Sequence, residues 1–475
     1  MRGNLGTARL RSALGLAALA VGLAVLVAAC GGGGGTTAAP ETTAPETTAP
    51  ETTAPETTAP ETVPTETVAA GGMIQQPGIC GDPSTQGQPA TGEPIKIGAM
   101  ATKVPGIDFT WITKMTGAYF DCVNENGGIH GRPIEYIAEE EQIDPQQIAA
   151  LATKLIEQDQ VLGIAGSTSI IECSVNKDYY AKMNFYPIIA GVSLDCFRSP
   201  NFSAVNMGPY YSDLGAAQAL VRMGAKGTIV VVSPNQPGYD AIQAGVVEFA
   251  EQNGLKGKAL LEDVPFSDPA GLAQRLVQEA GPGGGVILDM TGPTVVPLLQ
   301  AIEQQGLVDA VLWGASTPPN DPSVAQALSS AWNGKFNINA EFNVLDSTAP
   351  DQVLANAIDA KYVPDVPISA FQQMGFLAGK AATEALLRIE GDITVESVNA
   401  AFKALTNVTS DIWCKPWYYD STVGANVSNN TDLTVAPLDG NMVQKEDCFD
   451  IAVLPDNFLG EIRAKESELG LNVGG

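Results

Sequence analysis

The sequence predicts an α/β protein built from two doubly wound lobes with parallel sheets. Short apolar strands alternate with amphipathic helices from about residue 95 to residue 313, and this alternation is typical of parallel sheets covered by helices on both faces. The chain beyond residue 90 is too long for one ordinary core, which favours two lobes. A hydrophobic fraction of 45% with 16% charged residues is typical of a globular chain.

The expected elements follow from the spacing of apolar residues. Strands are predicted at residues 95–100, 134–138, 161–165, 187–190, 228–232, 258–263, 285–290 and 310–313. Helices are predicted at residues 112–123, 144–155, 170–183, 212–223, 238–253, 269–280, 294–305 and 371–387. Asp144 and Pro145 have the residue types of a helix N-cap and a first-turn proline. Residues 413–448 indicate irregular strands or hairpins that complete the second lobe.

The N-terminal residues have the pattern of an export signal. Arginines precede an uncharged Ala/Leu/Val run over residues 13–27, which is shorter than the ~20 apolar residues that a spanning helix needs. Small residues then lead to Cys30, and this ending resembles the lipobox of bacterial lipoproteins, in which the cysteine is lipidated. We expect residues 1–29 to be a lipoprotein signal peptide. The alternative is an ordinary signal peptide with a coincidental cysteine.

A low-complexity stretch separates Cys30 from the globular part. Five glycines are followed by a repeated Glu-Thr-Thr-Ala-Pro unit, which has no apolar period to bury. Its prolines and solvated carboxylates favour an extended, self-repelling chain. We therefore predict that residues 30–90 form a lipid anchor and a disordered linker.

The strong negative charge of the chain argues against two kinds of partner. A formal net charge of -28 argues against nucleic acid or an anionic membrane surface as a partner, because both would repel the chain.

Apart from Cys30, six cysteines remain, an even number that favours disulfides in an oxidising compartment. They are Cys80, Cys122, Cys173, Cys196, Cys414 and Cys448. The spacing leaves fifteen connectivities open; pairing neighbours along the chain would close three local loops.

Hydroxyl groups and glycines recur in the loops that follow the predicted strands. In open parallel sheets ligands gather at the carboxyl ends of strands, so these loops are where a binding site is expected. Small polar residues after two strands could hold an anion at a helix N-terminus; they are Ser167, Thr168, Ser169, Gly191 and Ser193. Further candidates follow the later strands, namely Tyr211, Tyr239, Thr291 and Ser316. The alternative for each hydroxyl taken alone is a plain helix cap.

Several motifs together resemble the leucine/isoleucine/valine-binding-protein family of type I solute-binding receptors. The matching segments are Lys96-Ile97-Gly98, the run 126–134 (Asn-Gly-Gly-Ile-His-Gly-Arg-Pro-Ile), the acidic residues 139–141 leading to Asp144-Pro145, and the Gly-Ser-Thr-Ser turn at 166–169. The resemblance implies a type I periplasmic-binding fold with three crossovers between lobes. It places residues 91–209 and about 345–405 in the N-terminal lobe, and residues 210–344 and about 406–475 in the C-terminal lobe.

The resemblance also implies where a ligand binds. Residues 167–169 (Ser167, Thr168 and Ser169) and Ser193, with Gly191, fall where family members hold the α-carboxylate of an amino acid by hydroxyls and amides. The second lobe departs from the pattern, because Tyr211 and Ser316 stand where family members grip the α-ammonium with acidic residues. A desolvated ammonium without a carboxylate is costly. The ligand is therefore expected to be a small polar molecule of amino-acid, amide or carboxylate type, with Asp213 or Asp289 as groups that could still reach inward.

The resulting hypothesis is an extracytoplasmic substrate-binding lipoprotein of an ABC importer. It implies a small-molecule ligand, ABC permease subunits as partners in the membrane, a lipid anchor on the extracytoplasmic face of a bacterial cell membrane, a monomer, and no cofactor or metal. A sensor or co-receptor with a separate membrane partner is the first alternative, and a secreted hydrolase the second. No nucleophile elbow, zinc motif or P-loop occurs, and the single His130 lies in a glycine-rich turn, so we do not expect an enzyme. Lys103 could pair with an anionic ligand, or be a solvated surface lysine.

Overall fold

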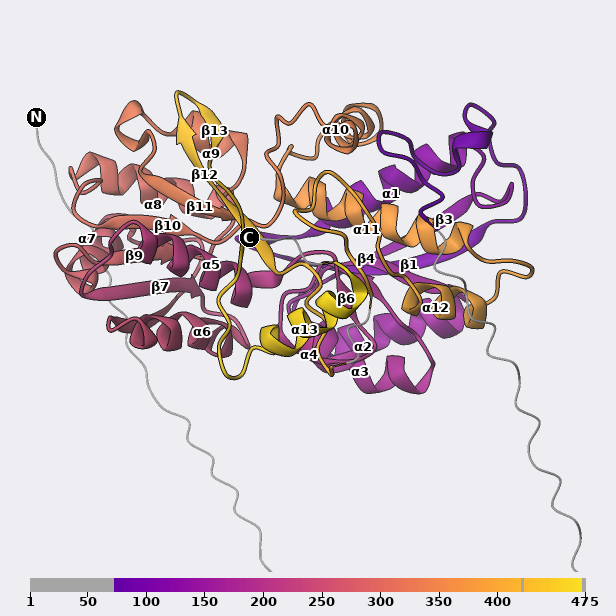
Figure 1. Ribbon diagram of the computed structural model, residues 1–475, viewed down its shortest axis with the longest axis horizontal. Helices are drawn as coiled ribbons and strands as arrows, with labels where there is room; N and C mark the ends of the chain where they lie inside the picture. The colour runs from indigo at the N-terminus through magenta and orange to yellow at the C-terminus, as the bar shows by residue number, and fades with distance from the viewer. Residues whose placement is uncertain (1–71, 420–422, 472–475) are drawn as a thin grey trace, which may run out of the picture. The chain divides into compact units, whose positions relative to one another are not determined.

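A computed structural model describes residues 72–419 and 423–471 (Figure 1). The predicted signal peptide, Cys30 and the Glu-Thr-Thr-Ala-Pro repeat lie outside these residues. Within the described ranges, no helix combines the length and apolarity needed to span a membrane.

The first sheet has six strands in the order β2-β1-β4-β5-β6, with β3 paired to β1. All its pairs are parallel except β1 with β2. Its strands are β1 (Ile95–Val104), β2 (Ile107–Asp108), β3 (Ile134–Glu141), β4 (Gly163–Ser167), β5 (Ile188–Ile189) and β6 (Ser203–Ala204). The helices of this half are α1 (Thr110–Glu125), α2 (Pro145–Thr153), α3 (Glu172–Lys182), α4 (Leu194–Arg198), α10 (Pro350–Tyr362), α11 (Ala370–Leu387) and α12 (Val395–Lys403).

The second sheet has seven strands in the order β13-β12-β11-β10-β9-β7-β8. Its strands are β7 (Thr228–Pro234), β8 (Lys256–Glu262), β9 (Gly285–Leu288), β10 (Leu312–Ala315), β11 (Phe336–Ala340), β12 (Thr431–Leu438) and β13 (Asn441–Asp450). The last two form an antiparallel hairpin at one edge, and β12 also runs antiparallel to β11, while the other neighbours are parallel. The remaining helices are α5 (Gly208–Arg222), α6 (Tyr239–Gln252), α7 (Pro269–Ala280), α8 (Gly292–Gln304), α9 (Pro322–Ala327) and α13 (Leu459–Leu469).

The prediction of a doubly wound α/β fold with two sheets is confirmed. Asp144 caps α2 by accepting from the backbone N–H of Gln146 at 2.7 Å and of Gln147 at 3.0 Å, as its residue type indicated. The prediction missed β6, because it is two residues long, and β11, because Asn337 and Asn339 interrupt its apolar pattern. Both asparagines are buried, since the helix α5 and the neighbouring strands cover that sheet.

The chain passes between the two sheets three times. It crosses after β6 into α5, returns after β11 into α10, and crosses again after α12 into β12. Three crossings are what the resemblance implied, whereas the lobe boundaries at residues 209, 344 and 405 remain a prediction. The third crossing is firmly held, because the indole N–H of Trp417 donates to the Ala204 carbonyl at 2.8 Å and that of Trp413 to the Val205 carbonyl at 2.9 Å.

Three disulfides join cysteines that are neighbours along the chain. They are Cys80–Cys122, Cys173–Cys196 and Cys414–Cys448. Of the fifteen possible connectivities, the structure therefore contains the one that closes three local loops. Each disulfide restricts the unfolded chain and thereby raises the free energy of unfolding by roughly 2–4 kcal/mol.

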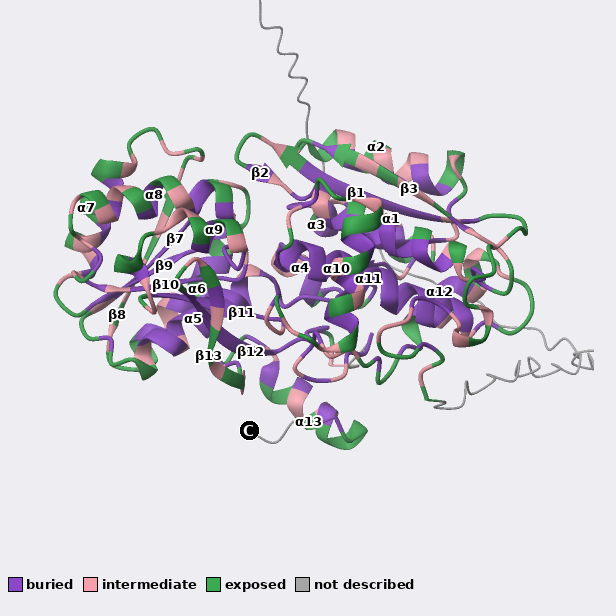
Figure 2. Ribbon diagram, turned by 90° about the horizontal axis from the view of Figure 1, so that it is seen from above, coloured by how far each residue is buried: buried purple, intermediate pink, exposed green. Residues whose placement is uncertain are grey.

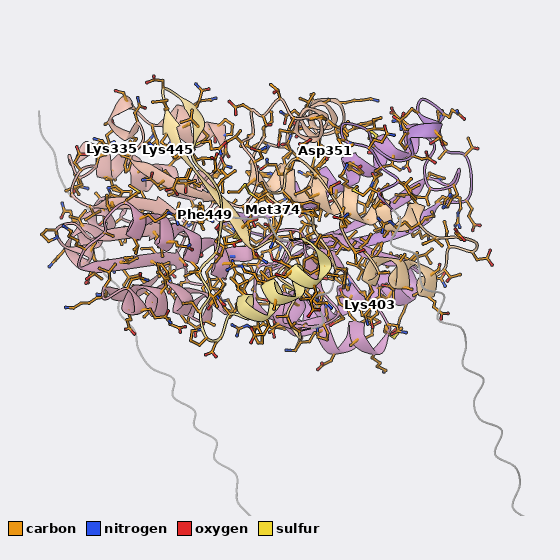
Figure 3. The ribbon with its side chains drawn as sticks, in the orientation of Figure 1. Lys335, Asp351, Met374, Lys403, Lys445 and Phe449 are labelled. Atoms are coloured by element: carbon orange, nitrogen blue, oxygen red, sulfur yellow. A yellow bond between two sulfur atoms is a disulfide. The ribbon has the colours of Figure 1, made fainter. Side chains whose placement is uncertain are left out.

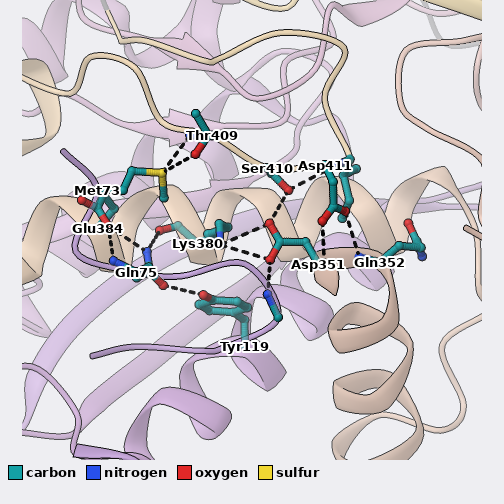
Figure 4. Close-up of polar contacts among 12 residues, drawn as sticks. Met73, Gln75, Tyr119, Asp351, Gln352, Lys380, Glu384, Thr409, Ser410 and Asp411 are labelled. Carbon is teal, nitrogen blue, oxygen red and sulfur yellow. Dashed lines mark hydrogen bonds and ion pairs between the residues drawn. The ribbon is translucent and has the colours of Figure 1, made fainter. Parts of the chain in front are cut away.

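The segment from residue 72 to residue 90 is docked on the first half rather than free, although the expected linker extended to residue 90. The backbone N–H groups of Ile74 and Gln75 donate to the Glu384 carboxylate at 2.9 and 3.0 Å, and Tyr119 donates to the Gln75 side chain at 2.5 Å (Figure 4). Glu384 lies on α11, a helix buried along its whole length (Figure 2). The disulfide to Cys122 then fixes Cys80 against α1.

Candidate functional site

A cavity of about 50 Å³ lies where loops from both sheets meet. Its polar lining side chains all come from the chain beyond the end of a strand or from the start of α5; they are Thr168, Asn206, Ser212, Asp289, Thr317 and Glu341. The apolar lining side chains are Phe109, Ile112, Val192, Pro209, Tyr239, Pro318, Phe371 and Met374, with Gly191 and Gly208 completing the wall. Met374 stands on α11 toward the elements of the second sheet (Figure 3). Polar groups at the carboxyl ends of strands within an apolar wall are typical of a ligand site.

The first-sheet side of the cavity is formed by Thr168, Gly191 and Asn206, which follow β4, β5 and β6. The N–H of Thr168 donates to the Met100 carbonyl at 2.8 Å, and the N–H of Gly191 donates to the Asn206 side chain at 2.7 Å. Thr168 is 3% exposed, and its hydroxyl has no hydrogen-bond partner. On this side the backbone donors of Thr168 and Gly191 are thus satisfied within the protein, and a hydroxyl oxygen is left open.

The other two hydroxyls of the predicted turn point elsewhere. Ser167 accepts from the N–H of Met100 at 3.0 Å, and Ser169 donates to the carboxylate of Glu141 at 2.8 Å. Glu141 also accepts from the Thr102 hydroxyl. Neither serine is among the residues that line the cavity, so their ligand-binding role remains a prediction.

A second buried carboxyl group, that of Glu172, lies behind the same turn at the start of α3. Burial raises the pKa of Glu172 to about 8, although hydrogen bonds from Tyr180 and Ser167 oppose this rise. The carboxyl group of Glu172 accepts from the Tyr180 hydroxyl at 2.7 Å.

Ser193 precedes α4, and its hydroxyl lies 3.6 Å from the sulfur of Cys196 rather than in the lining of the cavity. Tyr211 is buried in the core, where its hydroxyl donates to the Asn457 carbonyl at 3.1 Å. Tyr239 lines the cavity together with Gly191 and Thr168. The predicted residues that the structure brings together at the cavity are therefore these last three.

The second-sheet side is dominated by carboxyl groups. Asp289, 3% exposed, lines the cavity, and its Oδ1 accepts from the Ser316 hydroxyl at 2.8 Å. Ser316 thus contacts the site through Asp289 rather than by lining the cavity. Glu341, 1% exposed, lines the same cavity and accepts from the N–H of Met207. Asp289 follows β9 and Glu341 follows β11, the two strands on either side of β10.

Burial controls the protonation of these acids. It raises the pKa of Asp289 to about 6, opposed by hydrogen bonds from Ser316 and Ser233, and it raises the pKa of Glu341 to about 8, opposed by the Met207 N–H. Burial and the negative charge of Asp289 hold the pKa of Asp213 well above its usual range. Burial likewise holds the pKa of Asp432 well above its usual range. Burial thus shifts each of these acids toward its protonated form.

A second, smaller cavity of about 30 Å³ adjoins the first and shares Phe109, Tyr239, Asp289 and Pro318 with it. Here the hydroxyl of Thr294 donates to the carbonyl of Gly106 at 3.1 Å. Thr291 approaches the same carbonyl at 3.5 Å. These contacts join the loop after β1 to the start of α8, so they hold the two halves together at the rim of the site.

Lys103 lies in a wider groove outside this rim. Its ammonium pairs with the Glu140 carboxylate at 2.9 Å, and both side chains are exposed. Of the two interpretations offered for Lys103, the surface lysine agrees with this position.

Sequence reasoning missed Asn206 and Glu341 for one physical reason. Each follows a strand that the apolar pattern did not reveal, β6 for Asn206 and β11 for Glu341. The apolar lining residues Phe371 and Met374 lie on α11, which was predicted, but nothing local indicates which face of a fully buried helix meets the cavity. Only the packing of α11 against the loops decides this.

Two α/β sheets connected by three crossings, with a cavity between loops at their carboxyl edges, define a type I periplasmic-binding fold. Residues 114–440, more than half of the chain, match the periplasmic binding protein family. The chain belongs to this family. Its members are binding proteins, which agrees with the prediction that the chain is not an enzyme.

Individual relatives are distant. A Leu/Ile/Val-binding protein homolog 6 of Brucella melitensis is 25% identical over 168 residues, which are 35% of this chain and 43% of that relative. The match therefore spans less than half of the curated relative's length.

Solved structures agree in fold over most of the chain. A fatty acid ABC transporter substrate-binding protein from Thermomonospora curvata has a TM-score of 0.64 at 20% identity and covers 77% of this chain and 94% of its own. A branched chain amino acid ABC transporter protein from Thermus thermophilus, with bound valine, has a TM-score of 0.64 at 15% identity, covering 76% and 97%. A solute binding protein from R. palustris in complex with benzoate has a TM-score of 0.62 at 15% identity, covering 77% and 98%. These three proteins are described with different ligands, so the fold does not specify a ligand.

Proposed function

We propose that the chain is the extracytoplasmic, lipid-anchored substrate-binding protein of an ABC importer, and that it closes around a small polar organic ligand. The observation that carries this proposal is the cavity lined from both sheets by polar side chains at strand ends. Membership of the periplasmic binding protein family supports it, as does the structural likeness to substrate-binding proteins of ABC transporters. Among the predicted site residues, Thr168, Gly191 and Tyr239 then contact the ligand, and Ser316 orients Asp289.

Capture and release require the two halves to separate. The bond from the Thr294 hydroxyl to the Gly106 carbonyl crosses the rim, and such a side-chain contact can break without unfolding either half. The crossings would act as the hinge. A ligand enclosed between the halves adds contacts to both and shifts the population toward the closed form.

The membrane attachment in this proposal rests on the sequence around Cys30. Lipidation there would tether the folded part by the linker, which raises its concentration near a permease. We expect Cys30→Ser to move the protein from the membrane fraction to the soluble fraction while leaving the thermal stability of the folded part unchanged. Membrane retention of this variant, measured by fractionation and intact mass, would contradict the anchor.

The central experiment identifies the ligand and follows its transport. Native mass spectrometry of the purified full-length chain should show a bound small molecule that denaturing conditions release. Deleting the gene should abolish uptake of that compound. Intact uptake with an altered gene response would favour the sensor alternative, and turnover of the compound would indicate an enzyme. A chain that binds no small molecule in native spectra or in a thermal-shift panel would overturn the proposal.

A further inference from the structure

The cavity of about 50 Å³, called the first cavity below, continues toward the surface of the molecule. It shares Phe109, Tyr239, Asp289 and Pro318 with the second cavity of about 30 Å³. The second cavity shares four further residues with the wide groove outside the rim, called the rim groove below; they are Gly106, Ile107, Thr291 and Thr294. The three spaces therefore follow one another from the strand ends to the surface.

Polar side chains are concentrated at the inner end of this path. The hydroxyl of Thr168 lines the first cavity without a partner, so it can donate or accept a hydrogen bond. Tyr239 brings a second hydroxyl to the same cavity, and Asn206 and Asp289 add an amide and a carboxyl group. Since both donors and acceptors are present, the first cavity suits the polar head of a ligand.

The outer end of the path is larger and mostly apolar. The rim groove has a volume of about 640 Å³ and lies between the two halves. Its two charged side chains are already paired, because Lys103 pairs with Glu140 and Asp108 accepts from the N–H and the hydroxyl of Thr110. Its apolar side chains come from both halves and include Val104, Trp111, Phe266, Pro293 and Pro297.

An aromatic wall connects the two ends. The ring of Phe371, which lines the first cavity, lies 5.6 Å from the ring of Phe109 and 6.2 Å from that of Trp111. Phe109 lines both cavities, and Trp111 lines the rim groove. Aromatic rings cover hydrocarbon well, and the removal of hydrocarbon from water is favourable. The wall therefore suits an apolar chain that leads outward from the first cavity.

The partition between the second cavity and the rim groove can open at low cost. The Thr294 hydroxyl donates to the Gly106 carbonyl at 3.1 Å, and it lies 3.1 Å from the hydroxyl of Thr291. Gly106 is exposed, so water can replace the Thr294 donor, while the two threonines keep each other as hydrogen-bond partners. A hydrocarbon chain can thus separate these residues without leaving a buried polar group unsatisfied.

We infer that the ligand is an amphiphile, whose polar head lies in the first cavity and whose extended apolar tail runs through the second cavity into the rim groove. This inference rests on the proposed function and specifies its substrate class. The head is oriented by the polar side chains at the strand ends, and the tail lies along Phe109 and Trp111. Because the rim groove is at the surface, it accommodates tails of different length.

Homologous series of compounds test the tail. The purified full-length chain is titrated by calorimetry with butanoate, hexanoate, octanoate and decanoate, and separately with the 2-amino acids and the primary amides of the same chain lengths. Each buried methylene raises affinity about fourfold. In at least one series we therefore expect at least a tenfold rise from the shortest to the longest member. The series that binds identifies the charge of the head.

A variant in the rim groove locates the tail. Phe266 lines the rim groove but neither cavity, so Phe266→Ala should weaken the longest member at least about fivefold and leave the shortest member that binds unchanged. Leu438→Ala is the matched control, because Leu438 is an apolar side chain, 43% exposed, that lines none of the three spaces. It should bind as the parent does. Circular dichroism verifies the fold of each variant, and the length series on the parent chain stands even where a variant fails to fold.

The contrary outcomes are distinct. Affinity that stays level or falls with chain length in every series that binds would overturn the inference and leave the proposed function intact. No binding of any of these compounds would overturn the inference as well, while the native mass spectrum described above judges the proposed function separately. An equal loss for short and long members in Phe266→Ala would contradict a tail in the rim groove.

Discussion

Two buried acidic clusters of this protein differ in how they are completed. In the Lys380 cluster, formed by Lys380, Asp351, Glu384, Arg388 and Asp411, the protein supplies its own cations (Figure 4). Lys380 lies 3.2 Å from Asp351, with both side chains fully buried, and Arg388 lies 2.9 Å from Glu384. At the cavity, Asp289, Glu341 and their neighbours have no cation among the lining residues.

The difference separates a structural role from a binding role. Backbone donors complete the Lys380 cluster: Gly78 donates to Asp351 at 2.8 Å, and the N–H of Asp351 itself donates to Asp411 at 2.9 Å. The cluster therefore joins the N-terminal segment to the helices α10 and α11. At the cavity, burial rather than a cation controls the protonation of Asp289 and Glu341, and Asp289 has the carboxyl group of Asp213 as a hydrogen-bond partner. Buried acids that are paired with cations of the same chain indicate a structural role. Buried acids at a cavity with no cation among the lining residues indicate a binding role.

The largest expected effect comes from removing the cation of the Lys380 cluster. Lys380→Met should lower the free energy of unfolding by about 3–5 kcal/mol, because Asp351 would remain buried without a counter-charge. Denaturant unfolding measures this loss. Lys361→Met is the control: Lys361 pairs with Glu125 on the surface, so its loss should lower the free energy of unfolding far less than the loss of Lys380. Equal losses in the two variants would refute the structural role of the Lys380 cluster.

A smaller effect on stability is expected from pH, through the two acids whose pKa is raised to about 8, Glu341 and Glu172. Between about pH 4.5 and pH 8 the folded chain keeps protons on Glu341 and Glu172 that the unfolded chain has lost, so their contribution to stability falls as the pH rises. Glu341→Gln should flatten this slope and make the variant more stable than the parent at pH 9 by roughly 1 kcal/mol or more, at about 1.4 kcal/mol for each unit of pKa difference. Unfolding free energies at pH 5 and pH 9 test this. A parallel pH dependence for parent and variant would contradict the assignment.

The smallest effects compare two adjacent hydroxyls. Ser169→Ala removes a donor to the buried Glu141 and should cost about 1–3 kcal/mol, whereas Thr168→Val removes a hydroxyl that has no partner and should change stability by less than about 0.5 kcal/mol. The measurement is again denaturant unfolding of the ligand-free chain. A larger loss for Thr168→Val than for Ser169→Ala would mean that the cavity hydroxyl supports the fold and is not kept for a ligand.

The sequence predicted the fold well where elements are long and regular, and less well at the site. The helix beginning at Asp144 and Pro145 could be predicted because its cap and its apolar stripe are local properties. The turn at residues 166–169 was correctly expected at the end of a strand, but its three hydroxyls have three different environments. Which hydroxyl faces the cavity depends on Glu141 and Met100, whose contacts with the turn arise from strand pairing.

By itself, the sequence determined the α/β alternation, the export pattern ending at Cys30, and the loops in which a site should be sought. These properties are carried by neighbouring residues, so they can be recognised without long-range contacts. The tertiary structure decided that Asp289 and Glu341, separated by more than fifty residues, share one cavity, and that Ser167 and Ser169 do not line it. The charge that a ligand meets in the cavity depends on groups from both sheets. Only the folded chain brings those groups together.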